Sequence, residues 1–395
     1  MMALARFAAL LAFRQLRHRA LASLAALAGV AVAVMLMLVQ VGFRNGLYDS
    51  ALALPRALAA DLVLVSPGYR ALTFSPPWFP RAALRDAAGV AGVAETASLY
   101  AYSSQVRSPE TGANLSVWLL GIDPAARVLD LPEVVAAQRA LSVPETALLD
   151  RLSRQEFRAV VDQVTREGLA RLPIYAPSAD LAPVVTVRGL FTLGPSFTID
   201  GALLVSDLTL HATLGVPLDR VSIGLVRLEP GARPDAVAAA IAARIEGRAR
   251  VMTRAAYQEE ERHFYASRTP IGVIFNVGLL VGVAVGVVFI LQVLNGLVDA
   301  NLPEYAVLLA QGYRPAFLAA VVAQAAVAIA LVTYLPALGL ALGVTGAASG
   351  ITRLPIGLHP GDMAMVLALS LGMAAVAAGL AMLRLRRADP LELFG

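Results

Sequence analysis

Few residues in this chain have the types and spacing that catalysis or metal binding requires. The histidines lie far apart in the sequence and none sits at metal-ligand spacing from another: His18, His211, His263 and His359. There is no cysteine, which excludes thiol catalysis, disulfides and thiolate metal sites. All 32 basic residues are arginine, and a chain without lysine cannot form the nucleotide-binding P-loop, whose lysine contacts the phosphates. We therefore expect no catalytic site and no metal or cofactor in this chain.

The densest run of charge is YQEEERHFY, at residues 257–265. Its carboxylates and histidine could in principle exchange protons as an acid–base pair. Such a run is more typical of a solvated helix face, and no GxSxG nucleophile turn accompanies it. We therefore predict a solvated helix close to the membrane rather than an active site.

The composition is that of a membrane protein. Of the residues, 58% are hydrophobic and only 15% are charged, whereas soluble proteins average about 25% charged. A helix needs ~20 apolar residues to cross the hydrocarbon layer, and the charge-free windows predict spans at 21–43, 271–296, 316–342 and 363–383. No ionisable residue lies in the interior of any of these spans. The chain therefore lacks the buried charge relay that ion-coupled carriers use.

The placement of arginine predicts the orientation of the spans. Segment 1–20 contains four arginines, the tail 384–395 three and loop 299–314 one (Arg314), all expected on one side, whereas loop 343–362 on the other side contains only Arg353. By the positive-inside rule both termini are cytoplasmic and residues 44–268 lie on the other side. Because this rule explains the net charge of +4, we expect no nucleic-acid partner. Segment 1–20 is either an amphipathic elbow helix on membrane lipids or plain topology-setting charge.

Residues 44–268 read as a large α/β domain between the first two spans. Short β-rich runs such as DLVLVS, NLSVWLLGID and GALLVSDLTL end at Gly, Pro or Asp. Between these runs lie segments with the apolar spacing of helices. One helix is predicted over RLSRQEFRAVVDQVTREGLARL and another over PDAVAAAIAARIEG. We predict a βαβ unit made of the strand VSIGLVRLEPG, the second of these helices and the strand RVMTR. Span 1 continues with helical spacing to about residue 60, either as a rigid stalk or as a helix packed on the domain.

A short polar stretch, NLPEYAVLLAQGY at 301–313, separates spans 2 and 3. Pro303 suits the first helical position, Glu304 favours the positive end of the helix dipole, and Gly312 suits the left-handed residue after a helix. We predict a capped helix at about 302–311. Its face would carry Tyr305, Leu308, Leu309 and Gly312. It is either a docking element or simply a tight capped turn.

Gly278, Gly282 and Gly286 form GxxxGxxxG on one side of span 2. Such spacing lets another helix backbone approach closely. The pattern predicts a helix-packing seam, which would either join two copies of the chain or pack spans within one copy.

Several of these segments together resemble the DevC-type permeases of ABC transporters, within the FtsX/MacB-like permease superfamily. The resemblance rests on LPEYAVLLAQGY, LLDRLSRQEFR, GLFTLGPSFTIDGALLVSDL, IGLVRLEPGA, TPIGVIFNVG and LRRADPLELF, together with the first-span region RALASLAALAGVAVAVMLMLVQVGFRNGLYDSA. It covers essentially the whole chain. Leu309 departs from the pattern, because the family often has lysine there.

The resemblance implies a bacterial inner-membrane protein with cytoplasmic termini. Its fold would have four transmembrane helices plus a large extracytoplasmic α/β domain, made of a porter-like part with a β-rich insertion between helices 1 and 2. The chain would act as a homodimer with a separate ATPase subunit, which binds the ATP. The helix between spans 2 and 3 would dock on that ATPase through Pro303, Glu304, Tyr305, Leu308, Leu309, Gly312 and Tyr313.

The resemblance further implies an exporter that works by mechanotransmission. Helix motion driven by ATP would reach the periplasmic domain, which would contact a periplasmic membrane-fusion adaptor and, through it, a TolC-like outer-membrane duct. Export of a glycolipid or another amphiphile is expected. One alternative is an FtsX-like regulator that transports nothing and controls a periplasmic partner such as a cell-wall hydrolase. A second is a ligand sensor.

Overall fold

The described part of the chain consists of two compact units. The computed structural model describes residues 20–72, 77–108, 112–175, 182–197 and 199–387. A helical unit contains the chain up to Asn45, Pro270–Ala348 and the chain from Ile356 onward. An α/β unit contains Gly46–Thr269 together with Ser349–Pro355. The predicted elbow helix falls on residues 1–20, of which 1–19 lie outside the described residues, as do residues 388–395 of the tail.

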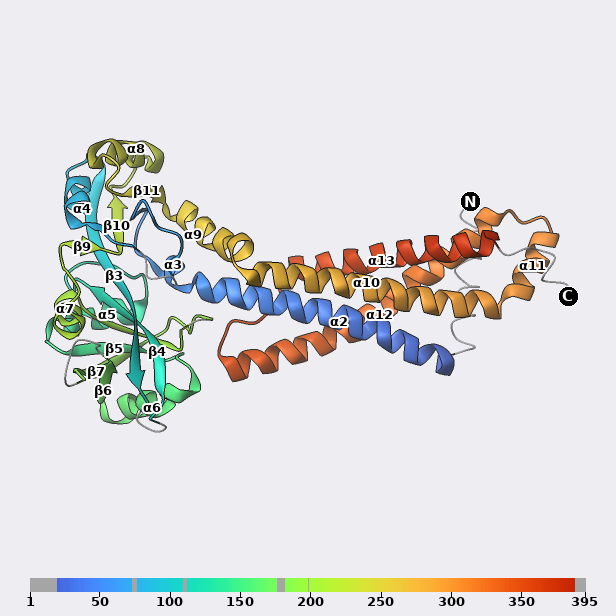
Figure 1. The fold of residues 1–395 in the computed structure, drawn as a ribbon, viewed down its shortest axis with the longest axis horizontal. Helices are drawn as coiled ribbons and strands as arrows, with labels where there is room; N and C mark the ends of the chain where they lie inside the picture. The colour runs from blue at the N-terminus through green and yellow to red at the C-terminus, as the bar shows by residue number, and fades with distance from the viewer. Residues whose placement is uncertain (1–19, 73–76, 109–111, 176–181, 198, 388–395) are drawn as a thin grey trace. The chain divides into compact units, whose positions relative to one another are not determined.

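The helical unit confirms the predicted number of membrane spans. Four described helices are long and apolar enough to cross a bilayer: α2 (Ala20–Ala51), α10 (Pro270–Ala300), α12 (Pro315–Thr352) and α13 (Pro360–Arg387). Each is longer than the ~20 residues that a span needs, because its ends continue into more polar sequence. α12 in particular extends into the segment expected to be a loop at 343–362, so the connection to α13 is only 353–359. Helices α10 and α13 run side by side (Figure 1).

The core of the helical unit is made of small and aliphatic side chains. Alanines on α12 and α13 are buried beside larger residues such as Met37 and Ile290. Small residues let helix backbones approach closely, which is the main source of packing energy where lipid removes the hydrophobic drive. Hydroxyl groups in this core donate to carbonyl oxygens one turn earlier, at 2.7 Å for Thr333 and 2.8 Å for Ser370. These polar groups are satisfied within their own helices.

The three glycines of GxxxGxxxG pack inside the chain. A Cβ atom added at Gly282 would lie 2.6 Å from Cγ of Met37, and one at Gly278 would meet Gln40, both on α2. A Cβ at Gly286 would lie 2.5 Å from Sδ of Met373 on α13. The glycines therefore support the alternative in which spans pack within one copy. The chain's own side chains occupy the space that a seam between two copies would need.

The α/β unit is built on one nine-stranded sheet. Its strand order is β11-β1-β10-β3-β4-β8-β5-β7-β6. In chain order the strands are β1 (Leu62–Val65), β3 (Val93–Arg107), β4 (Asn114–Ile122), β5 (Thr146–Asp150), β6 (Ala170–Tyr175), β7 (Val184–Phe191), β8 (Gly201–Ser206), β10 (Ile223–Leu228) and β11 (Arg250–Thr253). A two-stranded sheet joins β2 (Phe79–Pro80) to β9 (Arg220–Val221).

The long strand β3 joins the two halves of this sheet. It pairs with β10 through Val93–Leu99, with β4 through Leu99–Arg107, and with β6 at Gln105 and Val106. The porter-like part and the β-rich insertion expected from the sequence therefore share one continuous sheet. The predicted βαβ unit is present as β10, α8 (Pro234–Ile245) and β11, but β1 lies between its two strands and is antiparallel to both.

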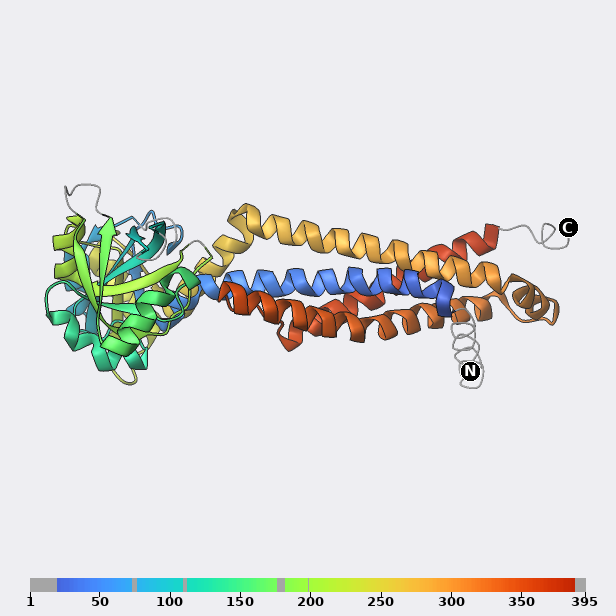
Figure 2. The same cartoon turned by 90° about the horizontal axis from the view of Figure 1, so that it is seen from below.

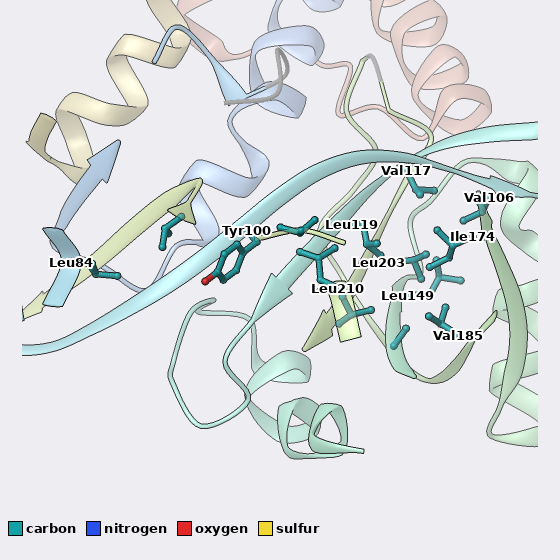
Figure 3. Close-up of a cluster of buried hydrophobic side chains, with 14 of the residues drawn as sticks. Leu84, Tyr100, Val106, Val117, Leu119, Leu149, Ile174, Val185, Leu203 and Leu210 are labelled. Atoms are coloured by element: carbon teal, nitrogen blue, oxygen red, sulfur yellow. The ribbon is translucent and has the colours of Figure 1, made fainter. Parts of the chain in front are cut away.

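Helices cover both faces of the sheet. Along β4 the side chains alternate, so that Val117 and Leu119 enter one core while Trp118 and Leu120 enter the other. The first core is closed by α4 (Arg81–Ala88), α6 (Arg158–Glu167), α7 (Asp207–Leu214) and α8, and Figure 3 shows its side chains gathered along the sheet. The second is closed by α3 (Ala53–Ala57), α5 (Pro132–Ala137) and α9 (Arg254–His263).

One predicted helix, over RLSRQEFRAVVDQVTREGLARL, is only partly correct. The structure divides this segment into a 3₁₀ turn, η3 (Gln155–Phe157), then α6, then strand β6. Gly168 ends α6 with φ of 75°, a backbone conformation that L residues with side chains rarely adopt. After it, the alternation of buried and exposed positions in ARLPIY is that of a strand. A second 3₁₀ turn, η2, covers Gln138–Ser142.

We expect Gly282→Val to destabilise the helical unit, because the new side chain would overlap Met37 on α2. Overpacking of a well-packed core costs about 1–3 kcal/mol. The thermal unfolding midpoint of the full chain in detergent would measure the loss. Gly343→Val on α12 is the matched control, since a Cβ there has nothing within 4 Å. Equal midpoints for the two variants would contradict close packing at Gly282.

Candidate functional site

The polar stretch between the second and third spans forms a short helix, α11 (Leu302–Ala310). It follows α10 at the end of the helical unit where the described part of α13 finishes (Figure 2). Pro303 and Glu304 are exposed in its first turn, and Gly312 follows its end with φ of 90°. These are the positions that the sequence predicted for each of them. The amide of Gln311 donates to the carbonyl of Val307, and that of Tyr313 donates to the carbonyl of Leu308, which closes the last turn.

The residues expected to form a docking surface divide between two faces of α11. Tyr305 is only 3% exposed, and it packs with the partly buried Leu302 and Leu308 on the core of the helical unit. Tyr313 is half-buried and its ring lies 5.0 Å from that of Phe317. These aromatic and aliphatic side chains fix the helix in place. The side chain of Leu309 lies outside the described part of the chain.

The other face of α11 is exposed. It presents Pro303, Glu304 and Val307, of which Val307 is 55% exposed. An exposed valine beside a carboxylate gives a surface with both apolar and negative character. The sequence did not single out Val307. Val307 lies one turn after Pro303 and Glu304 and on the opposite side of the helix from the inward-facing Tyr305. This spacing is the signal that could have identified it.

At the other end of the helical unit, polar groups join α2 to the start of α13. Asn45 donates to a carboxylate oxygen of Asp362 at 2.7 Å and to the carbonyl of Gly357 at 3.3 Å. Arg44 forms an ion pair with the same carboxylate at 3.6 Å, and the His359 ring lies 3.3 Å from it. Charged residues at helix ends are tolerated in membrane proteins because they reach the polar boundary. The cluster fixes the register between these two helices.

The charged segment 257–265 is not the solvated helix face that its sequence predicts. It forms the end of α9 and the start of a π-helical turn, η4 (Phe264–Arg268), which leads directly into α10. Tyr257, Glu261 and Tyr265 are buried, whereas Glu259 and Arg262 are exposed and form an ion pair at 3.0 Å. The error arises because one charged residue, Glu261, points inward among residues that point outward.

Glu261 is a buried carboxyl group that forms no ion pair with any of the described residues. It accepts hydrogen bonds from the Tyr69 hydroxyl at 2.5 Å and from the Leu72 amide at 3.1 Å, and the Tyr257 hydroxyl lies 2.7 Å from that of Tyr69. Burial raises the pKa of the Glu261 carboxyl from 4.5 to about 7, and the charge of neighbouring Glu260 adds to the rise, while the two hydrogen bonds oppose it. Near neutral pH this group is therefore close to its midpoint of titration. It ties α9 to the segment that follows β1.

The end of α12 and the start of the connection to α13, Ser349–Pro355, belong to the α/β unit. Arg353 donates to the carbonyls of Arg151 at 3.1 Å and Ser153 at 3.0 Å, and Gln155 donates to the carbonyl of Ile351 at 3.4 Å. Arg353 itself has φ of 59°, which is unusual for a residue with a side chain. In the sequence Arg353 indicates only topology, and no local pattern points to this anchor.

Two of the distinctive sequence motifs meet beside this anchor. Asp150, in LLDRLSRQEFR, is buried and accepts hydrogen bonds from the amides of Leu193 and Gly194 in GLFTLGPSFTIDG. Burial raises the pKa of its carboxyl, although the amide hydrogen bonds and Arg353 oppose the rise. Arg154 and Asp200, from the same two motifs, form an ion pair at 3.0 Å. The motifs thus have a structural role, because they close the turn at 151–155, to which segment 349–355 is hydrogen-bonded.

Two family models match the chain. One, described as the MacB-like periplasmic core domain, matches residues 23–244, and the other, described as FtsX-like permease C-terminal, matches residues 276–390. The first covers the initial span and most of the α/β unit, and the second covers α10 to α13. No curated protein matches the chain significantly.

Solved structures of the α/β part show a distant similarity. The extracellular domain of the noncanonic ABC-type transporter YknZ from Gram-positive bacteria is 15% identical, with a TM-score of 0.34, and the match covers 49% of this chain and 99% of that one. The periplasmic region of MacB from Actinobacillus actinomycetemcomitans is 9% identical, with a TM-score of 0.35, over 51% of this chain and 92% of that one. A domain of a permease-like protein from Porphyromonas gingivalis is 15% identical, with a TM-score of 0.32, over 49% and 88%.

We expect the attachment of α9 to weaken as the pH rises. Below the ordinary pKa of 4.5 the Glu261 carboxyl is protonated in both the folded and the unfolded state, so no free energy is lost in burying a charge. As the pH rises toward about 7, the unfolded state loses the proton first, and stability falls by about 3 kcal/mol before levelling off. Hydrogen exchange in segments 69–72 and 257–261 of the full chain, corrected for intrinsic rates, would show protection falling from about pH 5 to about pH 8.

Glu261→Gln should remove this pH dependence, because the amide oxygen still accepts from Tyr69 but does not titrate in this range. Glu259→Gln is the control, since Glu259 is exposed on the same helix. Protection that stays constant with pH in the unmodified chain would contradict the role given to Glu261.

Proposed function

Because this chain belongs to the FtsX/MacB-like permeases, which are membrane components of ABC-type transporters, we propose that it transmits motion from a separate ATPase to its α/β unit. The observation that carries this proposal is the two-sided helix α11. Tyr305, at 3% exposed, fixes it to the core of the helical unit, and Glu304 and Val307 are exposed on the other side. A partner that binds these residues can therefore push on the spans themselves.

The absence of an internal energy source supports an external one. The sequence has no lysine, so it cannot build a P-loop. The charged residues of the described spans lie toward the helix ends, as with Arg44 in α2, Asp299 in α10 and Asp362 in α13. A charge at the centre of a bilayer costs at least ~2.5 kcal/mol and is kept where a carrier needs it. ATP hydrolysis on a partner subunit is the energy source that fits these facts.

The continuity of the chain supports mechanical transmission. α2 continues as a single helix past Arg44 to Ala51, and α3 and β1 follow soon after in the chain. On the other side of the α/β unit, α9, η4 and α10 follow one another almost without a gap. A packed helix moves as a rigid element, so a displacement of α2 or α10 would be carried along its axis.

We assign the chain to a bacterial inner membrane, with α11 and both termini in the cytoplasm and the α/β unit in the periplasm. The distribution of arginine supports this orientation. In this setting two copies of the permease would act with the ATPase, and the α/β unit would engage a periplasmic adaptor leading to a TolC-like duct. An amphiphilic cargo such as a glycolipid fits a protein whose spans contain no charged pathway.

We expect Glu304→Arg to weaken recovery of the ATPase when the full chain is purified from detergent. Reversing one charge at the edge of an interface changes affinity by about tenfold. Glu304→Gln, which removes the charge but keeps the shape, should give a smaller loss. The unfolding midpoint of each variant would show that the helical unit is intact. Undiminished recovery of the ATPase with Glu304→Arg would contradict docking through α11.

The same purification distinguishes an exporter from a regulator. An exporter should bring down the ATPase together with an adaptor that carries a coiled-coil hairpin. Recovery of the ATPase with a cell-wall hydrolase and no adaptor would instead indicate a mechanical regulator. Transport of cargo by the chain in vesicles without any ATPase would exclude both.

A further inference from the structure

A small cavity of the α/β unit is lined in part by residues that come just before the second span in the chain. Its volume is about 200 Å³, and it is lined by Tyr69, Arg70, Arg250, Glu260, His263 and Arg268. Phe264 completes its wall. All of these residues come from three segments of one unit: the turn after β1, the strand β11, and the α9–η4 helix. No part of the function proposed above uses this cavity.

The charges around the cavity leave an excess of positive charge. Arg250 and Glu260 neutralise each other through two parallel hydrogen bonds, at 3.1 and 2.6 Å. Arg70 and Arg268 are both exposed, and neither has an ion-pair partner among the described residues. The His263 ring is 3.2 Å from the Ser267 hydroxyl. Two guanidinium groups therefore remain available to an anion.

Guanidinium groups bind phosphate and carboxylate groups through matched geometry. Each is planar and offers parallel N–H donors that match two oxygens of one phosphate. The exposed donors at this cavity are the positively charged guanidinium groups. The Tyr69 hydroxyl already donates to Glu261, so it does not compete with them for an anion. Glu260 is already occupied by Arg250, so it does not leave an unpaired negative charge to repel the anion.

The position in the chain specifies where that phosphate would come from. Arg268 stands two residues before Pro270, where the apolar helix α10 begins. Arginine and aromatic residues at this distance from a span lie at the level of the lipid headgroups. Phe264, which is partly exposed, supplies such an aromatic side chain in the turn before Arg268. A phospholipid places its phosphate at this same depth.

We propose that this cavity binds the phosphate of an anionic phospholipid headgroup, through Arg70 and Arg268. A zwitterionic headgroup has the same phosphate but adds a cation, which the two arginines would repel. The bound lipid would hold the η4 turn at the membrane surface where α9 passes into α10. This inference does not depend on the ATPase or on export.

The test is native mass spectrometry of the full chain in a neutral detergent. Phosphatidylglycerol and phosphatidylcholine with the same acyl chains would be titrated separately. We expect phosphatidylglycerol to bind more tightly, and Arg70→Gln with Arg268→Gln to remove one bound lipid by weakening its affinity about tenfold. Lysine at both positions should restore only part of the affinity, because lysine offers a point charge rather than a planar pair of donors.

Arg171→Gln with Arg188→Gln is the matched control, since it removes two exposed arginines from strands of the same unit. Its unfolding midpoint and that of the test variant should equal that of the unmodified chain. Equal binding of the two lipids, or no loss in the test variant, would overturn the proposal. Inorganic phosphate that displaces phosphatidylglycerol at equal concentration would also overturn it, by showing a site for free phosphate. ATPase recovery should be unchanged in the test variant.

Discussion

The cost of placing charge in hydrocarbon is the constraint on which this molecule depends. It empties the interiors of the four spans of ionisable side chains and confines Arg44, Asp299 and Asp362 to positions near helix ends. With polar chemistry excluded, the helices associate through alanine and glycine contacts and through hydroxyls bonded within their own helix. In the function proposed above, such a bundle transmits force that a partner subunit supplies at its polar ends.

Those ends are where the structure keeps its unusual features. At one end α11 is fixed by the buried Tyr305 and turned outward at Glu304. In the α/β unit, the segment entering α10 contains a π-helical turn and a buried carboxyl group at Glu261. π-helical turns are rare and occur frequently at functional sites, and buried unpaired carboxyl groups are costly. Both features lie where motion of a span would have to pass into the domain.

Much of the fold could be predicted from the sequence, because it follows from local patterns. Charge-free length gives the spans, and Pro303 and Gly312 define the ends of α11. The burial of Glu261 could not be predicted, because only the fold brings Tyr69 and Leu72 to it from far along the chain. The same holds for Asp150, whose partners Leu193 and Gly194 are remote in sequence. The inward packing of the three glycines also required knowledge of which helices are neighbours.

Arg353 anchors segment 349–355 in the α/β unit, and this segment adds to the places where the chain passes between the two units. The chain passes between them after Asn45 and Thr269, and again on either side of Ser349–Pro355. The segment between the last two spans is thereby held to the α/β unit by hydrogen bonds from Arg353 to Arg151 and Ser153. A displacement of α12 or α13 would then enter the α/β unit through its own stretch of chain, in addition to the stretches that follow α2 and precede α10.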